Sequence, residues 1–156
     1  MRILVPTDFS TNSWKTMQYI VDLMHHKKCN FKLLHTYELP SSSSGEIIDL
    51  HDNLKAEAEA KLLSLKKEIA DFTNSKLHTI NCQALHGDFL RVINRVAEEE
   101  KFDLIAISLT NKIYPDKVQH KGYAKRIIDN CKTPVIVVPD CYQADGIKLH
   151  NLAKNQ

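Results

Sequence analysis

The sequence contains no long run of apolar residues. The apolar start, Ile3-Leu4-Val5, is interrupted by Pro6 and Asp8, far short of the hydrophobic region of a secretory signal. No other stretch approaches the roughly 20 apolar residues that are needed to cross a bilayer. We therefore expect a soluble, cytoplasmic protein that makes no membrane contact.

Paired cysteines and an excess of one charge are also missing. The chain has 21 basic and 19 acidic residues, so its formal net charge is only +2. Nucleic-acid binding usually requires a clustered basic face, so we expect no nucleic-acid partner. The four cysteines form no CxxC pair, and an even number alone does not indicate disulfides. They are Cys29, Cys82, Cys131 and Cys141.

Common catalytic and metal-binding motifs are absent as well. There is no GxSxG and no GxxxxGK[ST], so we predict no catalytic residues and no dedicated enzyme. His25, His26 and Cys29 carry the nitrogen and sulfur donors that suit zinc, but no second ligand pair follows at a standard spacing. We predict no resident metal. A thiol- or metal-linked stress sensor built on these residues stays an alternative.

Short apolar runs alternate regularly with amphipathic segments. The runs predict strands at residues 3–5, 31–37, 77–85, 102–107 and 134–139. Apolar residues at three- and four-residue spacing predict helices at 12–28, about 50–73, about 88–101 and about 119–131. With 156 residues, the chain is most simply one domain, residues 1–139, followed by a polar tail, residues 140–156.

This alternation predicts an α/β fold. Each strand–helix–strand unit requires parallel strands with a right-handed crossover, which places helices on both faces of the sheet. We expect five mainly parallel strands in the order 3-2-1-4-5, as in flavodoxin-like folds. The topological switch point then lies between strands 1 and 4, where ligands bind in open sheets. The loop with Thr7 and Asp8 and the loop from Ser108 onward would face each other there.

The first strand is followed immediately by small polar residues. Pro6 has no N–H group, so we expect it to end the pairing of this strand. Thr7, Asp8 and Ser10 are good turn formers and helix caps, and Asn12 or Ser13 also suits the cap of the next helix. Asp8 therefore has two interpretations, a ligand contact at the switch point or a cap or turn residue, and the sequence does not choose between them.

Several stretches together resemble the universal stress protein family. They are Ile3-Leu4-Val5-Pro6-Thr7-Asp8-Phe9-Ser10, Leu33-Leu34-His35-Thr36, Gly87-Asp88, Asp103-Leu104-Ile105 and Thr133-Pro134-Val135-Ile136-Val137-Val138-Pro139. The resemblance covers residues 1–139 and implies a fold of the adenine nucleotide alpha hydrolase type with the strand order given above. It also implies a homodimer in which the last strands, Val135, Ile136, Val137 and Val138, pair across the interface. An apolar edge strand favours such pairing, whereas Pro134 and Pro139 could blunt it and leave a monomer.

The same resemblance implies a nucleotide site of which only part is present. ATP-binding members carry Gly-x-x-Gly, a nine-residue spacer and Gly-Ser or Gly-Thr, because glycines let backbone N–H groups approach phosphates. Here the matching positions are Ser108, Asn111 and, after ten residues, Gly122-Tyr123. Asp8 and Thr36 match the adenosine side. An adenosine-type ligand such as AMP, or no ligand, is thus favoured over ATP, with Thr7, Asp8, Thr36, Ser108, Asn111, Gly122 and Tyr123 as the candidate site.

The resemblance and the degenerate phosphate loop together predict the function. We expect a dimeric binding or regulatory module of the stress response that acts through an unidentified protein partner and does not bind ATP in the usual way. The alternatives are an adenine-nucleotide-binding switch or weak ATPase, and the thiol- or metal-linked sensor.

Overall fold

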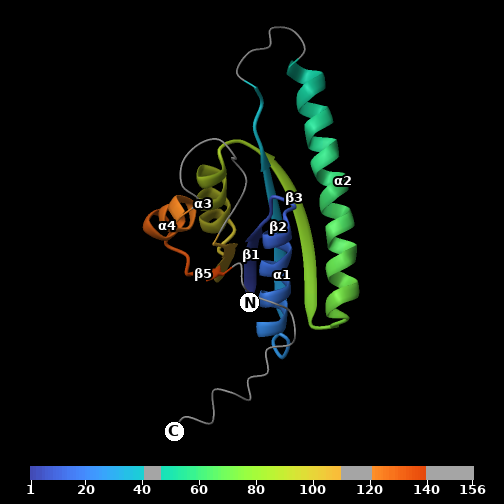
Figure 1. The fold of residues 1–156 in the computed structure, drawn as a ribbon, viewed down its shortest axis with the longest axis vertical. Coiled ribbons are helices and arrows are strands. Elements are labelled where there is room, and N and C mark those ends of the chain that lie inside the picture. The colour runs from blue at the N-terminus through green and yellow to red at the C-terminus, as the bar shows by residue number, and fades with distance from the viewer. Residues whose placement is uncertain (41–46, 110–120, 140–156) are drawn as a thin grey trace.

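In residues 1–40, 47–109 and 121–139, which the computed structural model describes, five strands alternate with four helices (Figure 1). The strands are β1 (Arg2–Pro6), β2 (Cys29–Tyr37), β3 (His78–His86), β4 (Leu104–Ser108) and β5 (Val135–Val138). The helices are α1 (Thr11–Leu23), α2 (Ile47–Thr73), α3 (Phe89–Glu99) and α4 (Lys121–Asn130). The predicted tail, residues 140–156, lies outside the described residues.

The strands form one sheet in the order β3-β2-β1-β4-β5, and every pair of neighbours is parallel. This confirms the order predicted from the sequence. β1 is therefore the central strand, and β3 and β5 are the two edges. The chain leaves β1 toward β2 and returns to the other side of β1 through β4, so the switch point lies between β1 and β4.

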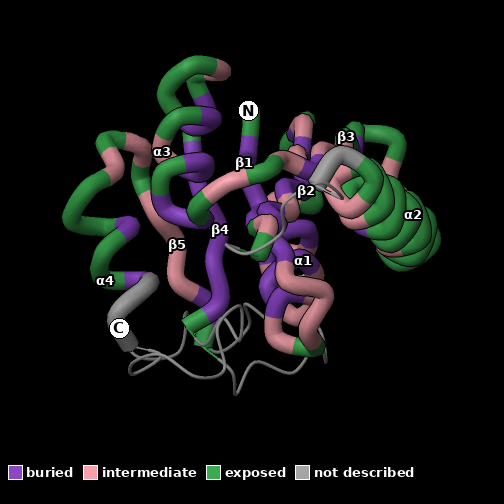
Figure 2. The backbone as a smooth tube through the Cα atoms, turned by 90° about the horizontal axis from the view of Figure 1, so that it is seen from above, coloured by how far each residue is buried: buried purple, intermediate pink, exposed green. Residues whose placement is uncertain are grey.

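Side chains of β1 alternate between two hydrophobic cores. Ile3 and Val5 belong to the core beneath α1 and α2, and Leu4 belongs to the core beneath α3 and α4. All three are fully buried, and Figure 2 shows β1 and β4 as the most buried part of the sheet. Complete burial of one such side chain contributes about 1.5–3 kcal/mol. The prediction of helices on both faces is confirmed.

Pro6 limits the pairing of β1 on one side only. It stands in register with Leu34 of β2, and Thr7 N–H donates to the Leu34 carbonyl oxygen at 2.9 Å, so the ladder with β2 continues past the proline. Arg2 C=O accepts from Asp103 N–H, so the alternate residues Arg2, Leu4 and Pro6 direct their backbone groups toward β4. The prediction that Pro6 ends all pairing is wrong; its missing N–H affects only the β4 side.

Helix α1 is shorter than predicted. It ends at Leu23 rather than residue 28, and the chain then turns, with Lys27 N–H donating to the Met24 carbonyl oxygen. Ser10, rather than Asn12 or Ser13, caps its start. The turn is needed because Cys29 already begins β2. The apolar stripe continued to Met24 in the sequence, and the cationic residues after it looked like a helix end.

The apolar stripes of α3 and α4 face the core with one clear exception. In α3, Phe89, Val92, Ile93, Val96 and Ala97 are all buried, as predicted. In the helix predicted at about 119–131, the spacing of apolar residues predicts inward positions for Ala124, Ile127, Ile128 and Cys131. Ala124 and Ile127 are buried, but Ile128 is 51% exposed, so this prediction is wrong for Ile128. Ile128 follows Ile127 by about 100° around the helix, which turns it away from the core. None of the described helices is both long and apolar enough for a membrane span.

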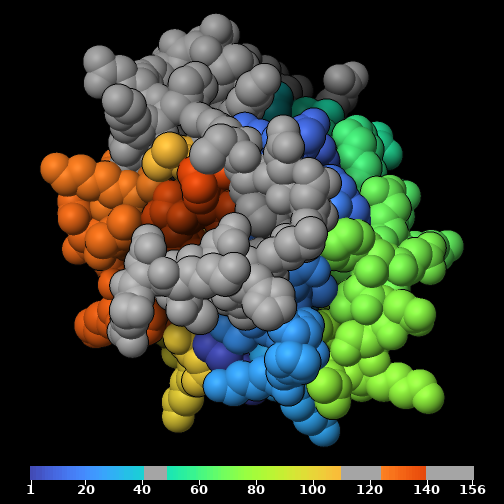
Figure 3. Space-filling view, turned by 60° about the horizontal axis from the view of Figure 1, so that its bottom comes forward, coloured from blue at the N-terminus to red at the C-terminus, as the bar shows by residue number. Residues whose placement is uncertain are grey.

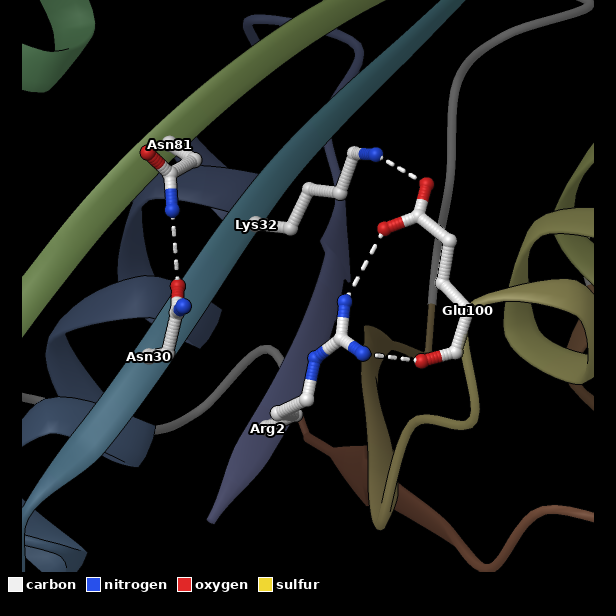
Figure 4. Close-up of polar contacts among 5 residues, drawn as sticks. All are labelled: Arg2, Asn30, Lys32, Asn81 and Glu100. Atoms are coloured by element: carbon white, nitrogen blue, oxygen red, sulfur yellow. Dashed lines mark hydrogen bonds and ion pairs between the residues drawn. The ribbon is translucent and has the colours of Figure 1, made fainter.

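A charged cluster joins β1, β2 and the end of α3 at the amino edge of the sheet (Figure 4). One carboxylate oxygen of Glu100 accepts from the Arg2 guanidinium at 3.1 Å, and the other accepts from the Lys32 ammonium group. The Glu100 carbonyl oxygen also accepts from the Arg2 guanidinium. Beside it, Asn81 donates to the Asn30 side chain at 2.8 Å, which links β3 to β2. The Lys32 side chain is only 14% exposed, so Glu100 compensates a largely buried positive charge.

Candidate functional site

The loops after β1 and β4 leave the sheet at adjacent positions. Ile3 and Leu4 are in register with Leu104 and Ile105, and the same offset places Thr7 beside Ser108. On the other side, Pro6 is in register with Leu34, which places Asp8 level with Thr36. The structure thus brings Thr7, Asp8, Thr36 and Ser108 to one edge of the sheet, at the switch point.

The β1–α1 loop is held by its own side chains. Thr7 is 3% exposed; its hydroxyl oxygen accepts from Phe9 N–H at 3.1 Å and lies 3.0 Å from the Ser13 hydroxyl. Asp8 Oδ1 accepts from Ser10 N–H at 2.9 Å, and the Ser10 side chain accepts from Ser13 N–H at 3.2 Å. These bonds satisfy amide groups at the start of α1 that have no partner within the helix. The conformation of the loop is therefore fixed by its own hydrogen bonds and does not require a ligand.

These contacts bear on the two interpretations of Asp8, as a ligand contact or as a cap or turn residue. The residue that caps α1 is Ser10, so a direct capping role for Asp8 is wrong. Asp8 instead forms an Asx turn to Ser10, which supports the turn interpretation. The carboxylate is half-buried at the strand end, so the turn also fixes where its negative charge lies. A turn residue and a ligand contact are compatible roles for this side chain.

His35 supports this loop from the neighbouring strand. Its Nδ1–H donates to the Thr7 carbonyl oxygen at 2.8 Å, and its ring lies against Phe9 with centroids 4.4 Å apart. Phe9 has a φ of 61°, a conformation that costs about 1 kcal/mol or more for a residue with a side chain. The contact with His35 and the bond to Thr7 hold Phe9 in this conformation. Burial lowers the pKa of His35 below 6.5; the bond to Thr7 and the charge of Asp8 offset part of that decrease.

This pKa makes stability depend on pH in a defined direction. Below pH 6.5 the unfolded chain binds more protons at His35 than the folded chain does. The contribution of neutral His35 is therefore complete above pH 6.5 and decreases as the pH falls toward the folded pKa, by at most about 1.4 kcal/mol per pH unit. We expect His35→Asn, whose amide can still donate to Thr7, to remove this part of the slope in urea denaturation between about pH 5 and pH 8. Equal slopes in both proteins would contradict this assignment.

The other half of the candidate site is described only in part. Thr36 and Ser108 are 8% and 5% exposed, so their side chains are largely enclosed by the protein. Gly122 and Tyr123 belong to the first turn of α4, and Asn111 lies outside the described residues. Leu109 N–H donates to the Val138 carbonyl oxygen at 2.9 Å, so the chain still follows β5 immediately after Ser108.

The residues of the sensor alternative are separated by the turn after α1. Cys29 is the first residue of β2 and is 2% exposed, and burial raises the pKa of its thiol. The rings of His25 and His26 lie against each other, with centroids 3.5 Å apart. Across the described part of the chain, no group of three or more His, Cys, Asp or Glu side chains is placed to hold a metal ion. A buried, protonated thiol is a poor redox sensor.

Two supporting contacts could not be identified from the sequence. Ser13 was considered only as a cap, but its hydroxyl is buried against Thr7. Phe9 gave no signal of a positive φ, because aromatic residues rarely adopt it. His35 bonds to Thr7, which is 28 residues away in the chain.

The universal stress protein family model matches residues 1–139 of the chain. Universal stress protein MJ0531 of Methanocaldococcus jannaschii is 28% identical over 143 residues, which cover 88% of this chain and 81% of that protein.

Solved structures with the same fold are also similar. Hypothetical protein MJ0577 matches with a TM-score of 0.75 and 24% identity, covering 91% of this chain and 97% of that one. UspA from Lactobacillus plantarum matches with a TM-score of 0.73 and 18% identity, covering 88% and 97%. Two matches with TM-scores of 0.58 contain nucleotides. They are an Archaeoglobus fulgidus protein with dAMP (16% identity, covering 88% and 96%) and an Arabidopsis thaliana protein with AMP (12%, covering 89% and 91%).

Proposed function

Because the chain belongs to the universal stress protein family, we propose that it is a non-catalytic regulatory module of the stress response that binds an adenosine-type ligand at the switch point. The observation that carries this proposal is the prebuilt β1–α1 loop, in which the Asx turn fixes the Asp8 carboxylate beside the end of β2. A negative charge at that place is suited to accept hydrogen bonds from ribose hydroxyls. Thr36, at the adjacent strand end, offers backbone groups to the adenine ring.

A monophosphate fits this site better than a triphosphate. Ser108 and Asn111 occupy positions where a glycine would let backbone N–H groups approach phosphates closely, and Tyr123 replaces the small hydroxyl residue after Gly122. Similar folds have been solved with AMP and dAMP, which require little or no phosphate cradle. The ligand proposed for Thr7, Asp8, Thr36 and the β4–α4 loop is therefore AMP or a related adenosine compound.

Binding is tested with a charge-neutral variant that keeps the turn. In Asp8→Asn the amide oxygen can still accept from Ser10 N–H, so the loop keeps its shape while the negative charge disappears. We expect calorimetry to show AMP binding to the unmodified protein, weaker ATP binding, and a Kd for AMP that is about tenfold higher in the variant. Asp88→Asn, which changes the capping residue of α3 in the same way, is the matched control.

Two results would contradict the nucleotide part of this proposal. One is tighter binding of ATP than of AMP, which would mean that the missing glycines do not matter. The other is an unchanged AMP affinity in Asp8→Asn. Mass spectrometry of small molecules released from freshly purified protein identifies a ligand that is already bound.

We propose no catalytic role for this site. The hydroxyl groups of Thr7 and Ser13 bond to each other, and His35 bonds to a backbone carbonyl rather than to a hydroxyl, so this cluster pairs no nucleophile with a base. A weak ATPase is further disfavoured by the degenerate phosphate loop. The proposal has three further parts. They are a cytoplasmic location, action through a protein partner, and a domain at residues 1–139 followed by a tail at residues 140–156.

A homodimer through β5 is the quaternary part of the proposal. Val135, Ile136 and Val137 are only half-buried, and β5 has a neighbour on one side alone. An exposed apolar edge favours pairing with a second copy. Light scattering at micromolar concentration tests the assembly. A monomer under these conditions would show that Pro134 and Pro139 are sufficient to protect this edge.

A further inference from the structure

The outer edge of β3 presents a complete row of unpaired backbone groups. Leu77 C=O accepts from Cys29 N–H, and Gly87 N–H donates to Tyr37 C=O, so the odd-numbered residues of this segment bond to β2. In a parallel ladder the intervening residues face the opposite way. Their N–H and C=O groups therefore point out of the sheet, and no described residue gives them a backbone partner. These residues are His78, Ile80, Cys82, Ala84 and His86.

This edge lacks the features that usually prevent pairing. β3 has nine residues and contains no proline, lysine, arginine, aspartate or glutamate. Short length, charge and proline are the common protections of edge strands. At the other end of the sheet, β5 has four residues between Pro134 and Pro139. β3 is thus the less protected of the two edges.

A groove runs between this edge and α2. Two hollows, of about 410 and 440 Å³, lie along it, and Lys66 lines both. The second hollow is lined by Leu63 from α2 and by Cys82 from β3, and the Leu63 residue is 55% exposed. Figure 1 shows α2 running beside β3, and Figure 3 shows α2 forming one flank of the molecule. An exposed leucine therefore lies next to the middle of an open strand.

We propose that β3 pairs with β3 of a second copy of this chain, antiparallel and centred on Cys82. This register places Ile80 opposite Ala84 of the partner subunit and His78 opposite His86 of the partner subunit. Every outward N–H and C=O group of both strands then has a partner. Asn81 lies opposite Gln83 of the partner subunit on the other face, where two amides can hydrogen-bond.

The charges of α2 favour a second copy over any other occupant. The helix face that borders the groove carries Glu59 on one side of Leu63 and Lys66 on the other. A two-fold axis through Cys82 and Leu63 makes the two α2 helices antiparallel, so each Glu59 approaches Lys66 of the partner subunit. Ala56 and Ala70, both exposed, allow the helices to come close. This face of α2 is thus complementary to the same face of a second copy.

This contact is separate from the proposed β5 dimer, because the two edges lie at opposite ends of the sheet. The proposal does not depend on nucleotide binding or on β5 pairing. It is tested by the exchange of the β3 amides and by the association of α2 variants.

Hydrogen exchange followed by NMR reports on the ladder directly. In the monomer, we expect fast exchange at Ile80, Cys82 and Ala84 and slow exchange at Asn81 and Gln83, which bond to β2. When the protein concentration is raised from micromolar to millimolar, we expect protection of the first group to increase at least about tenfold, as mass action predicts. The second group should change little.

Sedimentation of α2 variants tests the occupant. Leu63→Lys places two positive charges on the axis, and we expect the dissociation constant of the β3 contact to rise about tenfold or more. Glu59→Lys alone and Lys66→Glu alone should weaken association similarly. The double variant Glu59→Lys with Lys66→Glu should restore it, since the opposite charges meet again. All three positions lie on the surface of α2 facing the groove, and the double variant also controls for folding.

Any of three results overturns the proposal. The first is fast exchange at Ile80, Cys82 and Ala84 at concentrations where the protein is associated, which would locate the contact elsewhere. The second is a double charge-reversal variant that associates as weakly as the single variants. The third is a protein that stays monomeric at millimolar concentration.

Discussion

Replacing Glu100 with glutamine lowers the free energy of unfolding by about 2 to 3 kcal/mol. The change is nearly isosteric, but it removes the negative charge that Arg2 and Lys32 share. Arg2 is half exposed and can be solvated instead, whereas the Lys32 side chain is 14% exposed and cannot recover full hydration. Most of the loss therefore comes from an ammonium group left without a counter-charge. Urea denaturation at constant ionic strength measures the effect.

Two further variants separate this cause from general damage to the end of α3. Glu99→Gln changes an exposed neighbour and should shift stability by less than about 0.5 kcal/mol. Adding Lys32→Met to the Glu100→Gln background should regain part of the loss, because the aliphatic stem remains while the unpaired charge disappears. A double variant that is less stable than Glu100→Gln alone would contradict this explanation.

Gly87→Ala is expected to destabilise the protein by about 2 to 3 kcal/mol. Gly87 has a φ of 131°, which residues with a side chain rarely adopt, and a Cβ atom there would lie 3.1 Å from a methyl group of Val92. The position cannot relax easily, since its N–H bonds to Tyr37 and Asp88 immediately begins the cap of α3. Thermal unfolding followed by circular dichroism measures the loss.

The opposite substitution at the other end of α3 provides the matched control. Lys101 follows the helix with a φ of 53°, so Lys101→Gly relieves strain there. We expect a stability change between zero and about +1 kcal/mol, because the gain in the folded state is offset by the greater entropy of the unfolded chain. If both variants destabilised the protein equally, backbone conformation would not be the cause.

The architecture could be predicted because its signals are local and repeated. An apolar run such as Ile3-Leu4-Val5 predicts each buried strand. The alternation of these strands with amphipathic helices leaves few possible topologies. The errors occur where tertiary contacts decide a boundary. The stripe through Met24 suggested a longer α1, but the chain must turn before Cys29 to enter β2. Pro6 was expected to end pairing, and its effect turned out to depend on which neighbour its missing N–H faces.

The candidate site could be predicted only as a location. Topology placed Thr7, Asp8 and Ser108 together and the family resemblance added Thr36; the structure has all four at one edge of the sheet. Their interactions could not be predicted from the sequence, because the Asx turn of Asp8 and the buried contact between Thr7 and Ser13 depend on the three-dimensional path of the loop. The sequence could not identify Ser10 as the cap of α1, because four other residues were equally suitable by type: Thr7, Asp8, Asn12 and Ser13.

The central position of β1 also affects how the chain folds during synthesis. β1 is made first, but one of its two neighbours, β4, begins only at Leu104. The segment through His86 can already assemble β3-β2-β1 with α1 and α2. At about 5 to 20 residues per second, roughly one to four seconds then pass before β4 is complete. During that interval the β4 side of β1, with Leu4 uncovered by α3, is open to solvent or to a chaperone. β1, whose residues Ile3, Leu4 and Val5 are fully buried in the finished protein, is thus open on one side in the nascent chain.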